Sequence, residues 1–378
     1  MQLNSKNNSN RTHLAVIGAG PGGYAAAFLA ADLGLEVTLI DPDVNPGGVC
    51  LYRGCIPSKA LLHVSKLLEE SKEAQNWGIT FDKPEIDLKR LREWKEEVVR
   101  KLTGGLGQLS QQRKVRYVQG RAIFKSVNTL EISAQDGSKN DLEFDYAIIA
   151  TGSRPSSIPG MQIDSDRFWN STTALTLEKI PKKLLVVGGG YIGLEMGTVY
   201  ASLGSEVSVV EMMPGLLPGA DRDLVKILQK RLDNKFSDIM LNTRVSEMKA
   251  LKDGIRVTFE SDENGSTEKK YDNVLVSVGR KPNTENLGLE KLGISLDNRG
   301  FIKIDEQRRT EISTIFAIGD VAGEPMLAHK ASHEGKIAVE VIAGHKVVYE
   351  PQAIPLLVFT DPEIPWRVLT ETEAKERY

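Results

Sequence analysis

One stretch of the chain occurs twice, and the two copies lie 170 residues apart. The run Leu14–Gly23 aligns without gaps on Leu184–Gly193, and the similarity ends at an acid, Asp41 in the first copy and Glu211 in the second. In both copies the pattern predicts a buried strand, a glycine turn, an Ala- and Leu-rich helix and a second strand. A chain with this repeat is constrained to form two α/β units of the same kind.

The glycines of each copy have the spacing that a dinucleotide needs. The first glycine makes a tight turn, the second lets the backbone approach a pyrophosphate, and the third lets the helix pack closely on the strand. The start of the helix offers N–H groups to the phosphates, and the acid accepts hydrogen bonds from a ribose diol. One such motif is weak evidence, but two complete copies favour two dinucleotide sites over coincidental glycine turns. The glycines are Gly18, Gly20, Gly22 and Gly23 in the first copy, and Gly188, Gly190 and Gly193 in the second.

The second copy also favours one nucleotide over its phosphorylated form. Glu211 would repel a 2′-phosphate, and the residues that follow it, Met212–Pro214, include no arginine to neutralise one. The sequence therefore predicts NAD rather than NADP at this site.

Length and charge set the broad class of the protein. The 378 residues suffice for two or three domains, at about 100–200 residues per domain, and the formal net charge is −3. This balance gives no general reason to bind nucleic acid or an anionic membrane. No stretch is as apolar as a membrane span, and Met1–His13 lacks the apolar core of a secretory signal. We expect a soluble, cytoplasmic protein with a short disordered N-terminal tail.

Helices and strands are expected around the two glycine units. Two helical patterns, Leu61–Gln75 and Ile86–Leu109, follow the first unit, and the second pattern is interrupted at Thr103–Gly105. Short alternating strands are predicted between Val115 and Phe144. Further buried strands are predicted at Tyr146–Ala150, Val274–Val278 and Ile315–Ile318, each followed by a glycine turn.

The only two cysteines, Cys50 and Cys55, stand close together in the sequence. Two thiols exclude a disulfide-stapled scaffold and leave a tetrahedral zinc site half empty, so no metal is predicted. In an ideal helix five positions give ~7.5 Å of rise and ~140° of rotation, whereas a disulfide needs Cα atoms roughly 4.4–6.8 Å apart. Gly54 permits the distortion that a bridge requires, and Pro57 suits the first turn of a helix. A thiol there has a lowered pKa and is reactive. The alternative is a pair of buried structural cysteines.

The segment Gly47–His63 around these cysteines resembles the redox-active disulfide element of the pyridine-nucleotide disulfide oxidoreductases. Within that family, Pro57–Lys59 and Met326–Ala331 are most similar to the lipoamide dehydrogenases. The resemblance extends from Thr12 to the last residue. Its other specific blocks are Gly18–Gly23, Trp94–Leu106, Ala150–Pro155, Gly188–Glu195, Val276–Pro282 and Ile315–Ser332.

The resemblance implies an α/β fold with two Rossmann-like dinucleotide-binding domains, the FAD domain being split around the NAD domain. The start of an α+β interface domain would follow. The implied boundaries are 1–153 and 280–347 for the two parts of the FAD domain, 154–279 for the NAD domain, and 348–378 for the interface domain.

The resemblance also implies a role for each matching residue. Cys50 would exchange with the substrate and Cys55 would lie against the flavin as its charge-transfer partner. Lys59 would sit near the flavin, paired with Glu195. One non-covalent FAD would be held by Gly18, Gly20, Gly22, Gly23, Asp41, Gly48, Cys50, Lys59, Ala122, Thr151, Gly152, Asp320 and Ala328. NAD would be held by Gly188, Gly190, Ile192, Gly193, Glu211, Val245 and Gly279.

Some of these residues could also have a purely structural role. Asp320 in a Gly-Asp turn is commonly an Asx cap, and Lys59 taken alone is a solvated helix lysine. Tyr52 and Arg53 depart from the small or polar pair that usually separates the family's cysteines.

The implied reaction converts a dihydrolipoyl group and NAD+ into the lipoyl disulfide, NADH and a proton. The implied partners are a second copy of the chain and the lipoyl domains of 2-oxo-acid dehydrogenase or glycine cleavage complexes. The family's base lies in a C-terminal His-Pro-Thr segment, which this sequence, ending at Tyr378, does not contain. We therefore expect impaired lipoamide turnover, and an exposed edge strand at Leu356–Phe359. The alternatives are another NAD(P)H-dependent disulfide or mercuric reductase, and a non-catalytic flavoprotein subunit.

Overall fold

The computed structural model describes residues 13–263, 265–367 and 369–377. The chain divides into two compact units, and each is built from three separate segments. The first unit comprises Met1–Leu51, Lys101–Arg154 and Pro282–Glu350, and the second comprises Tyr52–Arg100, Pro155–Lys281 and Pro351–Tyr378. The predicted N-terminal tail lies outside the described residues.

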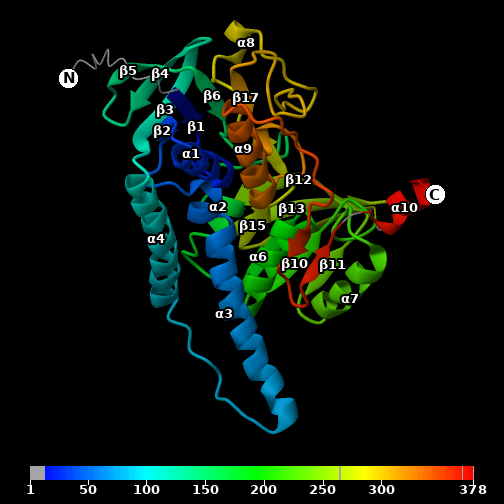
Figure 1. The fold of residues 1–378 in the computed structure, drawn as a ribbon. Coiled ribbons are helices and arrows are strands. Elements are labelled where there is room, and N and C mark those ends of the chain that lie inside the picture. The colour runs from blue at the N-terminus through cyan, green and yellow to red at the C-terminus, as the bar shows by residue number, and fades with distance from the viewer. Residues whose placement is uncertain (1–12, 264, 368, 378) are drawn as a thin grey trace. The chain divides into compact units, whose positions relative to one another are not determined.

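A seven-stranded sheet organises the first unit, and it is parallel except for two antiparallel strands at one edge (Figure 1). Helices α1 (Pro21–Asp32) and α9 (Ala328–Ile342) pack against each other, and a Cβ at Gly22 would come within 3.1 Å of Ala331. In order across the sheet the strands are β17 (Ile315–Ala317), β6 (Tyr146–Ile149), β1 (His13–Ile17), β2 (Glu36–Asp41), β3 (Arg116–Ser126), β4 (Thr129–Ala134) and β5 (Lys139–Glu143).

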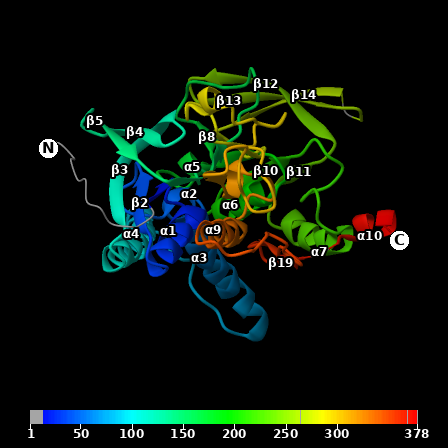
Figure 2. The ribbon, with the colours of Figure 1, turned by 45° about the horizontal axis from the view of Figure 1, so that its top comes forward.

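The second unit contains a five-stranded parallel sheet and a three-stranded antiparallel sheet. The five strands run in the order β11 (Asp238–Met240), β10 (Glu206–Val210), β9 (Lys183–Val187), β15 (Asn273–Val276) and β8 (Phe168–Asn170). The three strands β12 (Thr243–Leu251), β13 (Gly254–Ser261) and β14 (Gly265–Tyr271) lie side by side (Figure 2).

The predicted repeat is present in both units. β1, α1 and β2 form the first copy, and β9, α6 (Tyr191–Ser202) and β10 form the second. In each copy the two strands pair in parallel, and the glycine turn joins the first strand to the helix. The strands predicted between Val115 and Phe144, and those at 146–150, 274–278 and 315–318, are also confirmed, with ends that differ by a few residues.

Three helices carry the region after the first glycine unit: α2 (Gly48–Arg53), α3 (Cys55–Glu73) and α4 (Leu88–Gln112). The predicted interruption at Thr103–Gly105 is wrong, because α4 continues through it. Side chains at Gly104 and Gly105 would meet no atom within 4 Å among the described residues, so these glycines are not required by close packing. A glycine in a helix costs about 1 kcal/mol relative to alanine, which a helix of 25 residues tolerates.

The exposed edge strand expected at Leu356–Phe359 is present only in part, because it belongs to a two-stranded sheet and is paired on one side. Strand β18 (Leu356–Val358) pairs antiparallel with β19 (Ile364–Trp366), and Val358 and Ile364 are buried in the core of the second unit. Leu357 is the exposed residue of this strand, with 38% of its surface accessible. The other elements are η1 (Ala74–Trp77), β7 (Ser153–Pro155), α5 (Ser171–Ala174), α7 (Arg222–Asp233), β16 (Arg280–Pro282), α8 (Leu289–Leu292), η2 (Gly319–Val321) and α10 (Glu371–Arg377).

No helix within residues 13–263, 265–367 and 369–377 is both long and apolar enough to cross a membrane.

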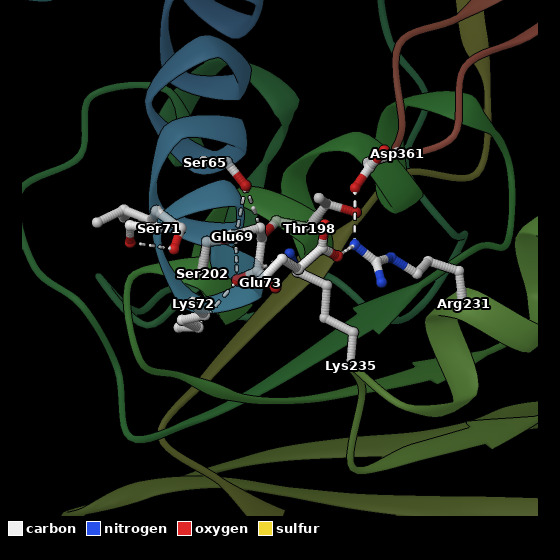
Figure 3. A network of polar contacts seen from close by, with 11 residues as sticks. Ser65, Glu69, Ser71, Lys72, Glu73, Thr198, Ser202, Arg231, Lys235 and Asp361 are labelled. Carbon is white, nitrogen blue, oxygen red and sulfur yellow. Dashed lines mark hydrogen bonds and ion pairs between the residues drawn. The ribbon is translucent and has the colours of Figure 1, made fainter. Parts of the chain in front are cut away.

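Polar contacts connect α3 to the rest of the second unit (Figure 3). Ser65 and Ser202 share a hydrogen bond of 2.5 Å between α3 and α6, and Lys235 lies 3.4 Å from the carboxylate of Glu69. Burial acts to raise the pKa of Glu69, but the hydrogen bond from Lys72 and the charge of Lys235 outweigh it, so this pKa is lowered. Burial in turn lowers the pKa of Lys235, against the opposing charge of Glu69.

The lowered pKa of Glu69 predicts an acid-dependent loss of stability. The carboxylate contributes stability above the ordinary glutamate pKa of 4.5, and this contribution is lost as the pH falls through the lowered value. We expect Glu69→Gln to destabilise the protein at pH 7, where Lys235 loses its counter-ion. The difference from the unmodified protein should shrink below about pH 4.

Urea unfolding midpoints measured at about pH 7 and at about pH 3.5 give this difference above and below the ordinary glutamate pKa of 4.5. Glu70→Gln, at the exposed neighbouring position on α3, is the matched control. A difference that is the same at both pH values would contradict the assignment.

Candidate nucleotide and dithiol sites

The glycines of the first turn fall into two classes. Gly18 has a φ of +99° and its Cβ would lie 2.3 Å from the carbonyl oxygen of Ala150, while a Cβ at Gly23 would lie 1.8 Å from the carbonyl oxygen of Gly18. These two glycines are therefore required by the protein's own backbone. Gly20 is different, because its Cβ would meet nothing closer than the Cα of Gly48, at 4.0 Å.

The second turn repeats this division. A Cβ at Gly188 would lie 2.7 Å from the carbonyl oxygen of Ser277, and one at Gly193 would lie 2.4 Å from the carbonyl oxygen of Gly188. A Cβ at Gly190 would meet no atom of the described residues within 4 Å. In both turns the middle glycine leaves open space beside the helix N-terminus. This is the space that a pyrophosphate needs, so both turns fit a dinucleotide.

The acid at the end of each repeat also holds its own glycine turn. Asp41 accepts hydrogen bonds from the N–H groups of Ala19, at 2.7 Å, and Asp43, at 2.9 Å. Glu211 accepts them from Gly189, at 2.7 Å, and Met213, at 2.8 Å. An ionised carboxylate has about four acceptor positions. Each acid can therefore hold the turn and still accept a hydrogen bond from a ribose.

Most residues proposed for FAD lie in the first unit around this turn. Gly48 has a φ of +58°, and a Cβ there would lie 2.6 Å from the Cα of Gly20. Thr151 donates its hydroxyl to the carbonyl oxygen of Asn283 at 2.7 Å.

Asp320, in η2, accepts a hydrogen bond from the Ser153 hydroxyl. Gly152 has a φ of +69°, Ala122 is buried in β3, and Ala328 is the first residue of α9.

A buried charge that was not predicted from the sequence lies close to Asp320. Glu334 of α9 is fully buried, and its carboxylate accepts a hydrogen bond of 2.6 Å from the N–H of Gly319. Arg308, at 3.0 Å, and Lys330, at 3.1 Å, neutralise it. Its signal in the sequence is an acid four residues after a lysine within a helix that otherwise buries small and apolar residues. This pairing fixes the start of the turn that carries Asp320.

The two cysteines are separated by a break between helices. Cys50 lies in α2 and is half-buried, and Cys55 begins α3 and is exposed. The division between the two units falls between them. Gly54 has φ −147° and ψ −110°, so the distortion expected at this residue is present. Ser58 donates its N–H to the carbonyl oxygen of Gly54 and its hydroxyl to that of Cys55, both at 3.0 Å, which fixes the first turn of α3.

One turn after Cys55, a lysine forms an ion pair within the second unit. The ammonium of Lys59 lies 2.9 Å from Oε2 of Glu195, which α6 presents two residues after Gly193. The side chain of Glu195 is 4% exposed and that of Lys59 is 31% exposed. The pair therefore connects the cysteine helix α3 to the helix of the second glycine turn.

The remaining residues proposed for NAD also lie in the second unit. Ile192 is the second residue of α6 and is half-buried. Val245 is buried in β12, opposite Phe259 of β13. Gly279 has a φ of +113° and follows β15. No group of three or more metal-ligating side chains occurs among the residues that the structure describes.

The division of the glycines predicts opposite effects for one substitution at two positions. We expect Gly190→Ala to leave stability unchanged and to weaken NAD binding by about tenfold or more, equivalent to ~1.4 kcal/mol. Gly193→Ala should instead destabilise the protein by about 1–3 kcal/mol, because the new methyl group overlaps the carbonyl oxygen of Gly188. Thermal unfolding and NAD titration measure the two effects. Equal destabilisation by both substitutions would contradict this assignment.

Residues 12–335 match the family described as pyridine nucleotide-disulphide oxidoreductase. The chain is 49% identical over 365 residues to a dihydrolipoyl dehydrogenase of Vibrio cholerae, and this alignment covers 97% of the chain and 76% of the relative. It is 50% identical over 366 residues to a dihydrolipoyl dehydrogenase of Haemophilus influenzae, with the same coverage.

Among solved structures, the crystal structure of LpdA from Mycobacterium tuberculosis is similar to the whole fold. The TM-score is 0.88 at 28% sequence identity, and the similarity covers 97% of this chain and 80% of that one. The predicted α/β fold class is thereby confirmed. The chain belongs to the pyridine nucleotide-disulphide oxidoreductase family, and within it to the dihydrolipoyl dehydrogenases.

Proposed function

We propose that the chain oxidises protein-bound dihydrolipoyl groups with NAD+. One observation carries the proposal: each unit has a glycine turn whose middle glycine leaves space for a pyrophosphate, and the chain passes from the first unit to the second between Cys50 and Cys55. Two nucleotides and a dithiol are the parts required to pass two electrons from a substrate dithiol to NAD+. The relatives at 49% and 50% identity carry the name of this activity.

The first unit would hold one non-covalent FAD and the second would hold NAD. Gly18, Gly20 and Asp41 would bind the adenine-side half of FAD, with Gly152 and Asp320 along the rest. Gly188, Gly190 and Glu211 would bind NAD. Bound FAD supplies a two-electron carrier between the dithiol and NAD+. The domain boundaries implied by the sequence, with the NAD domain at 154–279 and the FAD domain on either side of it, belong to this proposal.

In the proposed chemistry Cys50 and Cys55 form a disulfide in the oxidised protein. A dihydrolipoyl thiolate attacks Cys50, which forms a mixed disulfide and releases the Cys55 thiolate. The second dihydrolipoyl thiol then attacks its neighbouring sulfur in the mixed disulfide, and its proton passes to the departing Cys50 sulfur. This releases Cys50 and closes the lipoyl ring. Two electrons have then moved from the substrate to the cysteine pair, and the N-terminus of α3 favours the thiolate form of Cys55.

Lys59 would place a positive charge beside the flavin. Glu195 neutralises this ammonium without a mobile counter-ion, since the carboxylate is buried and 2.9 Å away. The partner proteins that we propose are the lipoyl domains of 2-oxo-acid dehydrogenase or glycine cleavage complexes. The proposed assembly is a homodimer.

The two cysteines are expected to differ in their optical signature. Reduction by NADH should produce a long-wavelength charge-transfer absorbance in the unmodified holoprotein, because the Cys55 thiolate lies against the flavin. Cys50→Ser should show this absorbance before reduction, since Cys55 can no longer form a disulfide. Cys55→Ser should lack it in both states.

Absorbance spectra during anaerobic titration with NADH decide this prediction, and they require no lipoyl substrate. A band that persists in Cys55→Ser would overturn the assignment of the flavin-side thiol. Rates with dihydrolipoamide and NAD+, compared with those for glutathione disulfide and Hg(II) with NADH, test the substrate class.

Glu211 is expected to determine the preference for NAD. Glu211→Gln keeps an oxygen to accept a backbone hydrogen bond but removes the charge that repels a 2′-phosphate. The ratio of kcat/KM for NADPH to that for NADH should therefore rise by roughly tenfold, since opposing like charges cost several kcal/mol. Asp221→Asn, an acid in the same unit at the N-cap of α7, is the control. An unchanged ratio in Glu211→Gln would show that Glu211 does not discriminate the nucleotides.

A further inference from the structure

A third residue contacts the ion pair of Lys59 and Glu195. Phe359 follows β18, and its N–H donates a hydrogen bond of 3.0 Å to Oε1 of Glu195. The ammonium of Lys59 lies 4.2 Å from the centroid of the Phe359 ring. Phe359 therefore contacts Glu195 through its backbone and Lys59 through its side chain.

The position of the Phe359 ring is held by its neighbours in the sequence. Val358 is 1% exposed and belongs to the core that also contains Leu61 and Leu62 of α3. Thr360 is buried and donates its hydroxyl to the carbonyl oxygen of Pro362 at 2.9 Å. Asp361 accepts a hydrogen bond from Arg231 at 3.1 Å (Figure 3). The ring is thus attached to a segment that is anchored on both sides.

The geometry assigns separate partners to the two oxygens of Glu195. Because Oε1 is occupied by the N–H of Phe359, Oε2 is presented to Lys59, and rotation of the carboxylate would leave a buried polar group without this bond. An aromatic face within about 6 Å attracts a cation, so the ring stabilises the ammonium at the place where Glu195 holds it. Lys59 is 31% exposed, and without the ring its flexible side chain would extend toward water.

We propose that Phe359 is a positioning residue for Lys59. It holds the ammonium in one place through its ring and orients Glu195 through its N–H, but it does not react with the substrate. The consequence for activity rests on the proposed function, because that function puts Lys59 beside the flavin. The contact itself does not rest on it.

The contact can be measured without any activity. Reductive methylation with 13C-formaldehyde labels lysines and keeps their charge, and the signal of Lys59 is identified by its absence in Lys59→Arg. In the methylated holoprotein without a substitution at Phe359, we expect the aromatic ring to shift this methyl signal upfield. The ring-induced shift should be lost in Phe359→Leu. Phe359→Tyr should restore it, because that variant keeps the aromatic face.

The matched control is Leu357→Ala, at the exposed position of the same strand, which should leave the Lys59 signal in place. If Phe359→Leu does not fold, Phe359→Met gives a side chain of similar reach without an aromatic face. A Lys59 signal that is the same in Phe359→Leu or Phe359→Met as in the unmodified protein overturns the proposal.

A second measurement examines the effect on the flavin. We expect Phe359→Leu to shift the equilibrium of flavin reduction by NADH about three- to tenfold toward the oxidised form, since the positive charge is held less firmly. Tenfold corresponds to about 30 mV for a two-electron couple. Phe359→Tyr should restore the equilibrium, and a shift that tyrosine does not restore contradicts a role for the ring.

The two proposals fail separately. If the protein oxidises dihydrolipoamide at no measurable rate but Lys59 shows the ring-dependent shift, the proposed function fails and the positioning contact stands. If the unmodified protein oxidises dihydrolipoamide and the Lys59 signal is insensitive to Phe359, the positioning role fails and the function stands.

Discussion

The rest of the structure depends on the close approach of helix to strand at the two glycine turns. At Gly23 and Gly193 an added Cβ would lie within 2.4 Å of the carbonyl oxygen of the first glycine of the same turn. Only a residue without a side chain lets the helix start directly over the end of the strand. This approach points the N-terminus of the helix at the space beside Gly20 or Gly190. Each unit therefore obtains a phosphate-binding geometry from its own backbone.

The acids at Asp41 and Glu211 show why the second strand of each repeat must end where it does. Each carboxylate lies close enough to bind an N–H group of the glycine turn, with distances of 2.7 Å for Ala19 and for Gly189. The acid thus connects the end of the second strand of the repeat to the glycine turn that follows the first strand. A nucleotide that binds there meets a carboxylate that is already oriented, so less conformational entropy is lost on binding.

Sequence periodicity predicted those parts of the fold that depend on residues close together in the chain. The two repeats and the short strands after Val115 are of this kind. The interruption predicted at Thr103–Gly105 was wrong because two glycines do not stop a long helix whose surroundings favour its continuation. Glu334 and Phe359 were missed for another reason: Phe359 contacts Glu195, which is 164 residues away in the sequence. The sequence pattern within a short segment cannot indicate a contact between residues so far apart in the chain.

Glu195 connects three parts of the second unit that are remote in sequence. It belongs to the helix of the second glycine turn, pairs with Lys59 on the cysteine helix, and accepts the N–H of Phe359 beside β18. A buried carboxylate with one partner on each oxygen has little freedom to rotate, since any orientation between the two equivalent ones loses a hydrogen bond. The position of Lys59 is therefore set by two elements besides its own helix. In this arrangement the segment after residue 350, for which the family resemblance implies a separate interface domain, contributes directly to the surroundings of the cysteine helix.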